Sequence, residues 1–288
     1  MTENNLLPHT PEDAKSVNLN IKYTFGSTRR LLSAVRRAVD EYHMIGENDR
    51  ICVGLSGGKD SLTLLTLLSS LRRFYPKKFE LFAVHMDPAF YDAGFGTKED
   101  AERGISALHD FCAQLDVPFH TERTHIAEIV FSVRREENPC SLCSRMRRGA
   151  LHGAAKLLSC NKLALGHHFD DAVETLIMNL FNEGRIGCFS PVTYLDRRDI
   201  TVIRPLLYCS EKSIRYFVSR SDLPLIESSC PADKDSERKR VKELLRRLEK
   251  EEYPGLKHRL FGAMQKADLD GFGIESKEDK NASESHDL

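Results

Sequence analysis

A buried strand that runs into a glycine-rich turn and then a helix is the feature that most constrains this chain. The run VGLSGGKDSLTLL, residues 53–65, passes from branched apolar residues through two glycines and a lysine into a helical apolar pattern. A helix N-terminus offers unpaired backbone N–H groups and a partial positive charge, which suit an anion. Glycine removes the Cβ atoms that would keep phosphate oxygens from the backbone. The pattern predicts a nucleotide-phosphate site at a strand end.

The loop differs from a Walker A loop, which has four residues between its first glycine and its Gly-Lys-Ser/Thr element. Here three residues separate Gly54 from Gly58, and Asp60 follows Lys59. An aspartate beside a polyphosphate repels it unless a cation lies between them, so Asp60 predicts Mg²⁺ at this site.

Strand patterns alternate with helical patterns of 10 to 20 residues along most of the chain. Strands are expected at 51–55, 79–87, 118–125 and 162–167, and residues 183–199 are expected to form a loop. Alternation of this kind predicts an α/β fold with a doubly wound, mostly parallel sheet and helical additions at both ends. Ligands bind such sheets at the carboxyl ends of the strands, where both LSGGKDS and GHHFDD (residues 166–171) fall.

The expected organisation has four parts. They are a flexible N-terminus over 1–25, a nucleotide-binding domain over 26–205, a helical portion over 206–268 that supplies Cys230, and a disordered acidic tail over 269–288. The apolar runs are far shorter than the roughly 20 residues of a membrane span, and the polar N-terminus lacks the apolar core of a signal peptide. We expect a cytoplasmic protein without a membrane partner.

Eight cysteines in such a chain favour metal or redox chemistry for some of them. Cys140 and Cys143 form a C-x-x-C pair in the predicted loop EENPCSLC, and Cys230 is the best distant partner. Three thiolates on a four-iron cluster leave one iron without a protein ligand, free to carry sulfur. A zinc site completed by His152 or another cysteine, or inert buried thiols, are the alternatives. The other five cysteines are expected to be small buried hydrophobes.

The loop SGGKDS resembles the PP-loop of the N-type ATP pyrophosphatases, which have an adenine nucleotide α-hydrolase-like fold. Together with PCSLCSRMRRGAL and ALGHHFDDAVETLIMNLFNEG, it resembles the tRNA 2-thiocytidine synthetase family from about residue 20 to 265. The resemblance implies an enzyme that adenylates a cytidine carbonyl in the tRNA anticodon loop and replaces its oxygen with sulfur. ATP, Mg²⁺ and a [4Fe–4S] cluster are the implied cofactors. A sulfur donor such as a cysteine desulfurase is the implied partner beside tRNA.

The resemblance also assigns residues. The ATP-binding set is Ser56, Gly57, Gly58, Lys59, Asp60, Ser61, His85, Asp87, Gly166 and His167. The catalytic set is Lys59, Asp60, Arg147, Asp170 and Asp171, although one of the last two can instead cap a helix. The cluster ligands are Cys140, Cys143 and Cys230. The close family has a second C-x-x-C where this chain has Cys230 alone, which leaves the exact substrate open.

The net charge of −1 permits an RNA partner without requiring one. The tail from Gly273 to Leu288 carries −3 and the rest of the chain +2, with arginine clusters at 29–37, 145–148 and 238–247. The same chemistry on another tRNA base or a small molecule, a cluster-free ligase such as lysidine synthetase, and a nucleotide-sensing protein stay open as alternatives. A homodimer also stays open.

Overall fold

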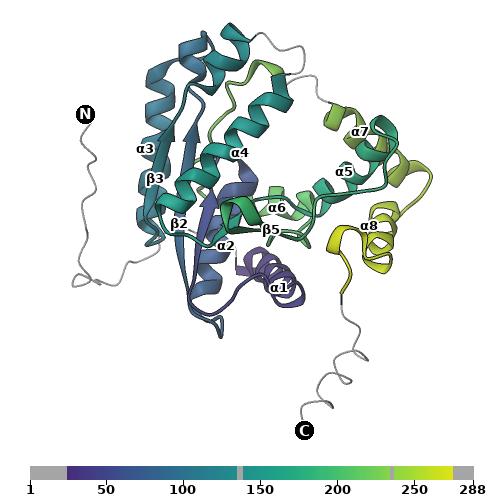
Figure 1. Cartoon of the computed structure of the whole chain (residues 1–288). Helices are drawn as coiled ribbons and strands as arrows, with labels where there is room; N and C mark the ends of the chain where they lie inside the picture. The colour runs from purple at the N-terminus through teal and green to yellow at the C-terminus, as the bar shows by residue number, and fades with distance from the viewer. Residues whose placement is uncertain (1–24, 135–138, 234–236, 275–288) are drawn as a thin grey trace.

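A six-stranded sheet lies at the centre of the molecule in this computed structural model, which describes residues 25–134, 139–233 and 237–274 (Figure 1). The strands follow the order β3-β2-β1-β4-β6-β5, with β5 antiparallel to β6 and every other pair parallel. Their bounds are β1 Asp49–Gly54, β2 Phe79–Asp87, β3 Phe119–Arg123, β4 Lys162–Ala164, β5 Val192–Leu195 and β6 Ile200–Ile203. The predicted doubly wound, mostly parallel α/β sheet is confirmed.

The direction in which the sheet grows reverses at β1. Strands β2 and β3 follow on one side of β1, whereas β4 pairs with its other side along residues 51–53. In open α/β sheets, ligands bind in the crevice at the carboxyl ends of the strands that flank such a reversal. The loops after β1 and β4 border this crevice, so the two polar runs LSGGKDS and GHHFDD come together there.

Helices cover both faces of the sheet, and β1 shows why. Ile51 and Val53 point into a core completed by α1, α2, α3 and α6, while the alternate residue Cys52 points into the core under α4. A third cluster joins α5, α7 and α8, which stand to the right of the sheet in Figure 1. The helices are α1 Phe25–Glu41, α2 Lys59–Arg72, α3 Lys98–Gln114, α4 Pro139–Leu157, α5 Phe169–Asn182, α6 Glu211–Val218, α7 Glu237–Glu251 and α8 Leu256–Lys266.

Helix α2 is buried on almost every side because it lies between the sheet and helices α1 and α6. Its hydroxyl groups are tolerated there, since Thr63, Thr66 and Ser70 donate to carbonyls one turn earlier at 2.7, 2.9 and 2.9 Å. This packing holds the N-terminus of α2, and the loop before it, in a fixed place at the end of β1.

Three local expectations need correction. The predicted loop at 136–143 is partly helical, because α4 begins at Pro139 and carries Cys140 and Cys143 in its first turns. The predicted loop at 183–199 contains β5, which pairs with β6. The predicted disordered tail begins too early at 269, because Phe272 is fully buried in the cluster of α5, α7 and α8.

The N-terminus predicted to be flexible lies, up to residue 24, outside the described residues, as does the tail from 275. Among the helices that the structure describes, none combines the length and the apolar character needed to cross a membrane.

Candidate active site

Two cavities open at the carboxyl ends of β1, β2 and β4. One, of about 340 Å³, lies between the loop after β1, the end of β2 and α3. The other, of about 330 Å³, lies between that loop, α4 and the loop after β4. Ser56, Met86 and Arg147 line both cavities, so the two spaces meet at these side chains. A nucleotide and an acceptor molecule can therefore occupy neighbouring positions.

The loop between β1 and α2 keeps its backbone available to an anion. Gly58 is the N-cap of α2 and provides no side-chain cap, so the first N–H groups of the helix stay open to a ligand. The two serine hydroxyls brace the loop from inside. Ser61 Oγ donates to the Gly58 carbonyl at 3.0 Å and accepts from Ser56 N at 3.1 Å, and Ser56 Oγ accepts from Gly58 N at 3.3 Å.

An extended segment, residues 222–230, lies across this loop, and we call it the strap. Ile226 N donates to the Gly57 carbonyl at 3.0 Å. A Cβ atom added at Gly57 would lie 2.7 Å from Ile226, one at Gly104 of α3 would lie 3.0 Å from it, and one at Gly96 would lie 3.0 Å from Ser229. The absence of side chains at these three glycines thus leaves room for the strap. Cys230, at the end of the strap, lines the 340 Å³ cavity.

Lys59 and Asp60 form an ion pair at the N-terminus of α2. Lys59 Nζ lies 2.7 Å from Asp60 Oδ2 and 3.5 Å from Glu211 Oε1 on α6. Burial alone would raise the pKa of Glu211, but hydrogen bonds from Lys242 and Arg215 lower it to about 2. Glu211 is therefore an anion, and its carboxylate attracts the Lys59 ammonium group. No motif in the sequence pointed to Glu211 as part of this site.

Asp60 Oδ1 is a buried oxygen without a hydrogen bond among the described residues. Its neighbour His168 Nε2 lies 3.7 Å away, which is too far for a hydrogen bond. The loop after β4 also packs tightly here, since a Cβ at Gly166 would lie 3.2 Å from the Asp60 backbone. Asp60 also lines the 330 Å³ cavity, and an unsatisfied carboxylate oxygen has the chemistry of a hard-cation ligand.

The loop after β4 divides its side chains between the cavity and the protein interior. His168, rather than either aspartate, is the N-cap of α5, and Asp171 completes a capping box by accepting from His168 N at 2.9 Å. Asp171 still lines the 330 Å³ cavity together with His167. Asp170 lines neither cavity, because its two oxygens accept from Glu211 N at 2.7 Å and Lys257 Nζ at 2.6 Å. Its predicted catalytic role stays a prediction.

His167 is a neutral imidazole at the cavity wall. Burial and the neighbouring Arg204 lower its pKa to about 4, so the ring is uncharged near pH 7. It packs against Phe189 with ring centroids 4.9 Å apart, and Nδ1 makes no hydrogen bond within the described chain. The imidazole therefore keeps an unused ring nitrogen beside this cavity.

At the end of β2, His85 and Asp87 line the 340 Å³ cavity as predicted. His85 Nδ1 lies 2.9 Å from the Leu55 carbonyl, and burial lowers the pKa of this side chain. Asp87 Oδ1 accepts from Ala89 N at 2.8 Å, and its Oδ2 accepts from the Tyr91 hydroxyl at 3.1 Å. Both residues thus shape the turn after β2 and leave an aromatic wall that includes Tyr91.

The three predicted metal ligands lie near one another, and Cys230 among them lines the 340 Å³ cavity. Burial raises the pKa of Cys143, the Arg147 cation lowers it, and the charges of Cys230 and Cys140 raise it, so all three groups act on one thiol. None of the cysteines forms a disulfide. Within residues 25–134, 139–233 and 237–274, no three His, Cys, Asp or Glu side chains are already arranged to hold a metal ion.

The remaining cysteines lie where small hydrophobes are expected. Four of them are buried and Cys188 is partly buried. Burial raises the pKa of Cys188 to about 12, which makes its thiol inert. His152, the alternative zinc ligand, lines neither cavity.

Buried Glu174 on α5 should make stability depend on pH. Its side chain is 2% exposed, and burial together with the charge of Asp171 raises its pKa from 4.5 to about 7. The folded state therefore binds this proton more tightly than the unfolded state does. The resulting stability is complete below about pH 4.5 and is lost as the pH rises through about 7, a change of about 3 kcal/mol at most.

We expect Glu174→Gln to flatten the fall in unfolding free energy between about pH 4.5 and about pH 7. Urea denaturation of the wild type and of Glu174→Gln at each pH measures the unfolding free energy. An equal fall with pH in the wild type and the variant would contradict this assignment. Asp110→Asn, at an exposed site on α3, is the matched control.

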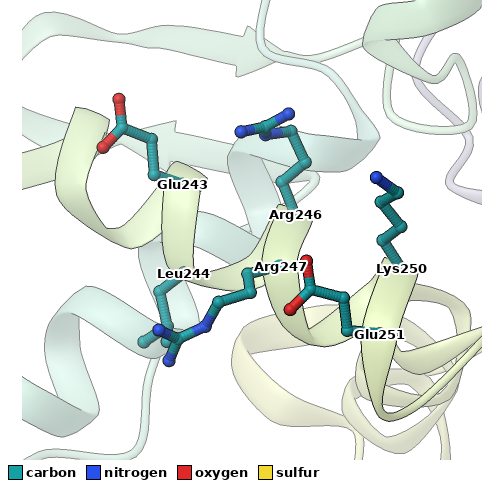
Figure 2. A pocket seen from close by; sticks show the side chains of 6 residues that line it. All are labelled: Glu243, Leu244, Arg246, Arg247, Lys250 and Glu251. Carbon is teal, nitrogen blue, oxygen red and sulfur yellow. The ribbon is translucent and has the colours of Figure 1, made fainter.

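A third hollow, of about 450 Å³, lies on the surface of α7 (Figure 2). Its lining comes from this helix alone: Glu243, Leu244, Arg246, Arg247, Lys250 and Glu251. Cations and carboxylates mix there, and none of the loops at the sheet crevice reaches it. The hollow is a surface groove and we do not assign catalysis to it.

Comparison with known proteins gives consistent results. The family model of the PP-loop domain matches residues 30–248, past the predicted domain boundary at 205. The chain is 46% identical over 226 residues to the tRNA-cytidine(32) 2-sulfurtransferase of Pelobacter propionicus, covering 77% of this chain and 80% of that protein. It is 40% identical over 248 residues to the protein of the same name from Geobacter sulfurreducens, covering 85% and 90%.

Among solved structures, the chain resembles the U34-tRNA thiolase NcsA from Methanococcus maripaludis with its [4Fe-4S] cluster. The TM-score is 0.66 at 24% identity, and 84% of this chain and 78% of that chain are covered. This likeness supports the fold.

Proposed function

The chain belongs to the tRNA-cytidine(32) 2-sulfurtransferase family of PP-loop proteins, and from that premise we propose that it activates cytidine 32 of tRNA with ATP and replaces the C2 oxygen with sulfur. One observation carries the proposal. The cavity at the phosphate loop and the cavity beside His167 meet at Arg147, next to three thiols. Nucleotide, base and sulfur can thus come within reach of one another.

The first step is adenylation. The phosphates of ATP rest on the open N–H groups of the loop at residues 56–61, with Lys59 adding a full positive charge. The cytidine O2 attacks the α-phosphorus, an oxygen–phosphorus bond forms, and pyrophosphate leaves. Lys59 and Arg147 stabilise the charge that develops on the phosphoryl oxygens. Neutral His167 forms a hydrogen bond with the base at the cavity wall.

The second step substitutes sulfur for the activated oxygen. A carbon–sulfur bond forms at C2, the C2–O bond breaks, and AMP leaves with the former base oxygen. The base has to leave its stack to enter the cavity, which costs least in a single-stranded loop such as the anticodon loop. The sulfur enters at the oxidation level of sulfide. A donor such as a cysteine desulfurase, which carries its sulfur as a persulfide, therefore works together with a two-electron reductant such as a thiol.

Cys140, Cys143 and Cys230 would hold a [4Fe–4S] cluster. They fit because none of them is in a disulfide and because Cys140, Cys230 and Arg147 all act on the pKa of Cys143, which burial raises and Arg147 lowers. When bound, the cluster supplies an iron without a protein ligand, at which sulfide can be presented to the activated carbon. The fold would supply the position of the cluster, since the strap brings Cys230 to the 340 Å³ cavity and the first turns of α4 carry Cys140 and Cys143.

Asp60 would bind Mg²⁺ through its unsatisfied buried oxygen. We expect Asp60→Asn to lower the rate of AMP formation about 100-fold and to raise the Mg²⁺ concentration needed for half-maximal rate, because a neutral amide is a weaker cation ligand. Magnesium titrations of AMP release measure both quantities. Asp110→Asn is again the matched surface control, and an unchanged Mg²⁺ midpoint in Asp60→Asn would refute this role.

RNA has basic surfaces to contact outside the cavities. On α7, Arg246, Arg247 and Lys250 are exposed and make no ion pair with other described residues (Figure 2). Such cations favour phosphates through counterion release.

The decisive experiment is anaerobic reconstitution with iron and sulfide, followed by incubation with ATP, Mg²⁺ and unmodified tRNA. Nucleoside analysis should reveal 2-thiocytidine, formed with AMP and only when ATP is present. A thiolated uridine would refute the choice of base, and AMP formation that ignores tRNA would refute the RNA substrate.

A further inference from the structure

The largest of the cavities described lies away from the catalytic one, between α1, α6 and α8. It measures about 820 Å³, within the range of about 300–1,000 Å³ typical of ligand pockets. In Figure 1, α1 lies below α6 and α8 stands to the right of both. Its lining includes Arg30, Lys212, His258 and Tyr216, and contains no acidic residue among those described.

Two cations of this cavity, Arg30 and Lys212, are not paired with acidic side chains of the described chain. Arg30 and Lys212 are exposed, and their side chains form no ion pair or hydrogen bond with any other described residue. Nearby cations differ: Arg37 pairs with Glu41, Arg215 with Glu211, and Lys257 with Asp170. Cations that neutralise nothing inside the protein are available to an external anion.

Aromatic rings stand beside these charges. Tyr216 is 51% exposed at the cavity, and His258 packs on Phe169 with ring centroids 4.9 Å apart. The Arg220 guanidinium also lies over the Tyr216 ring, 5.4 Å from its centroid. An exposed ring beside cations is an arrangement with which proteins hold single-stranded nucleic acid, since a base stacks on the ring while the cations contact the backbone.

The loops that line this cavity also carry residues of the active site. Phe169 lies between His168 and Asp170, and its N–H donates to the Cys209 carbonyl at 3.1 Å. Ser210, also in the lining, directly precedes Glu211, which pairs with Lys59. A ligand held here therefore lies on the same two loops that support the catalytic groups.

We propose that this cavity binds an unpaired nucleotide of the tRNA substrate outside the reactive base, with its phosphate on Arg30 and Lys212 and its base on Tyr216. The inference rests on the proposed function, because it gives the same RNA a second point of attachment. It places substrate recognition on α1 and α6.

The test compares tRNA binding by the full-length protein and the double variant Arg30→Gln, Lys212→Gln. We expect affinity at low salt to fall about tenfold and the slope of log Kd against log salt to decrease by about 1.5 to 2. Arg73→Gln with Lys78→Gln is the control, because both residues are exposed at and beyond the far end of α2, away from the crevice. Tyr216→Ala should weaken binding about fivefold or more without changing the salt slope.

Steady-state thiolation separates this inference from the proposed function. The double variant should raise the KM for tRNA and leave kcat unchanged. If wild-type protein makes no 2-thiocytidine, the proposed function fails. If wild-type protein thiolates tRNA and the double variant keeps its tRNA affinity, or changes only self-association in sedimentation, the inference fails alone.

Discussion

Replacing Cys230 with serine is expected to lower tRNA thiolation at least about 100-fold, because a serine hydroxyl is a poor ligand for iron. Cys230 ends the strap at the cavity that Ser56, Gly58 and Arg147 also line. Anaerobically reconstituted protein should lose most of its roughly four irons per chain. ATP binding should change little, since the phosphate loop keeps its contacts. Iron analysis, calorimetric ATP binding and nucleoside analysis measure the three effects.

Cys188→Ser is the matched control for this substitution. Cys188 Sγ donates to the Ala172 carbonyl at 3.4 Å, and a serine hydroxyl can replace that bond. The control should keep its iron and its activity. Should Cys230→Ser retain a full complement of iron, Cys230 would not be a cluster ligand and the three-cysteine proposal would fail.

Replacing Gly57 with alanine is expected to impair ATP binding and thiolation by about 100-fold. Gly57 has φ +79°, where a residue with a Cβ costs about 1–2 kcal/mol. The new Cβ would also lie 2.7–2.8 Å from three atoms of Ile226. Overpacking of this kind costs about 1–3 kcal/mol, so the loop or the strap has to move. Either movement separates the phosphate site from Cys230.

Gly94→Ala separates the two causes. Gly94 has φ +84° but nothing within 4 Å of an added Cβ, so only the backbone strain applies there. ATP affinity and thermal unfolding should therefore change much less in this variant. Adding Ile226→Ala to Gly57→Ala should restore the part due to the clash. Equal effects at Gly57 and Gly94 would show that the strap does not constrain the loop.

Chemistry that is local in the chain was accessible from sequence. The spacing within residues 56–61 placed a phosphate loop between β1 and α2, and the alternating pattern predicted the parallel sheet, both of which the structure and the family model confirm. Short elements were harder. Strand β5 has four residues and is only partly buried, so no strong apolar pattern marks it.

Roles that depend on direction were not accessible from sequence. Asp170 and Asp171 are adjacent and chemically identical, yet Asp170 contacts Lys257 whereas Asp171 lines the cavity. The difference arises because successive residues of a helix face about 100° apart. No sequence pattern pointed to Glu211 or Ile226 as part of the site. Their contacts with Lys59 and Gly57 cross more than 150 residues of chain.

The amino-acid order by itself determined the kind of chemistry: a phosphate loop, a pair of thiols and a run of acids, each assembled from residues close together in the chain. Tertiary structure alone decided which of these groups share a cavity, because long-range packing sets the direction of each side chain. Glycines at three separate positions leave the space that the strap occupies, and the strap places Cys230 at the cavity beside the phosphate loop.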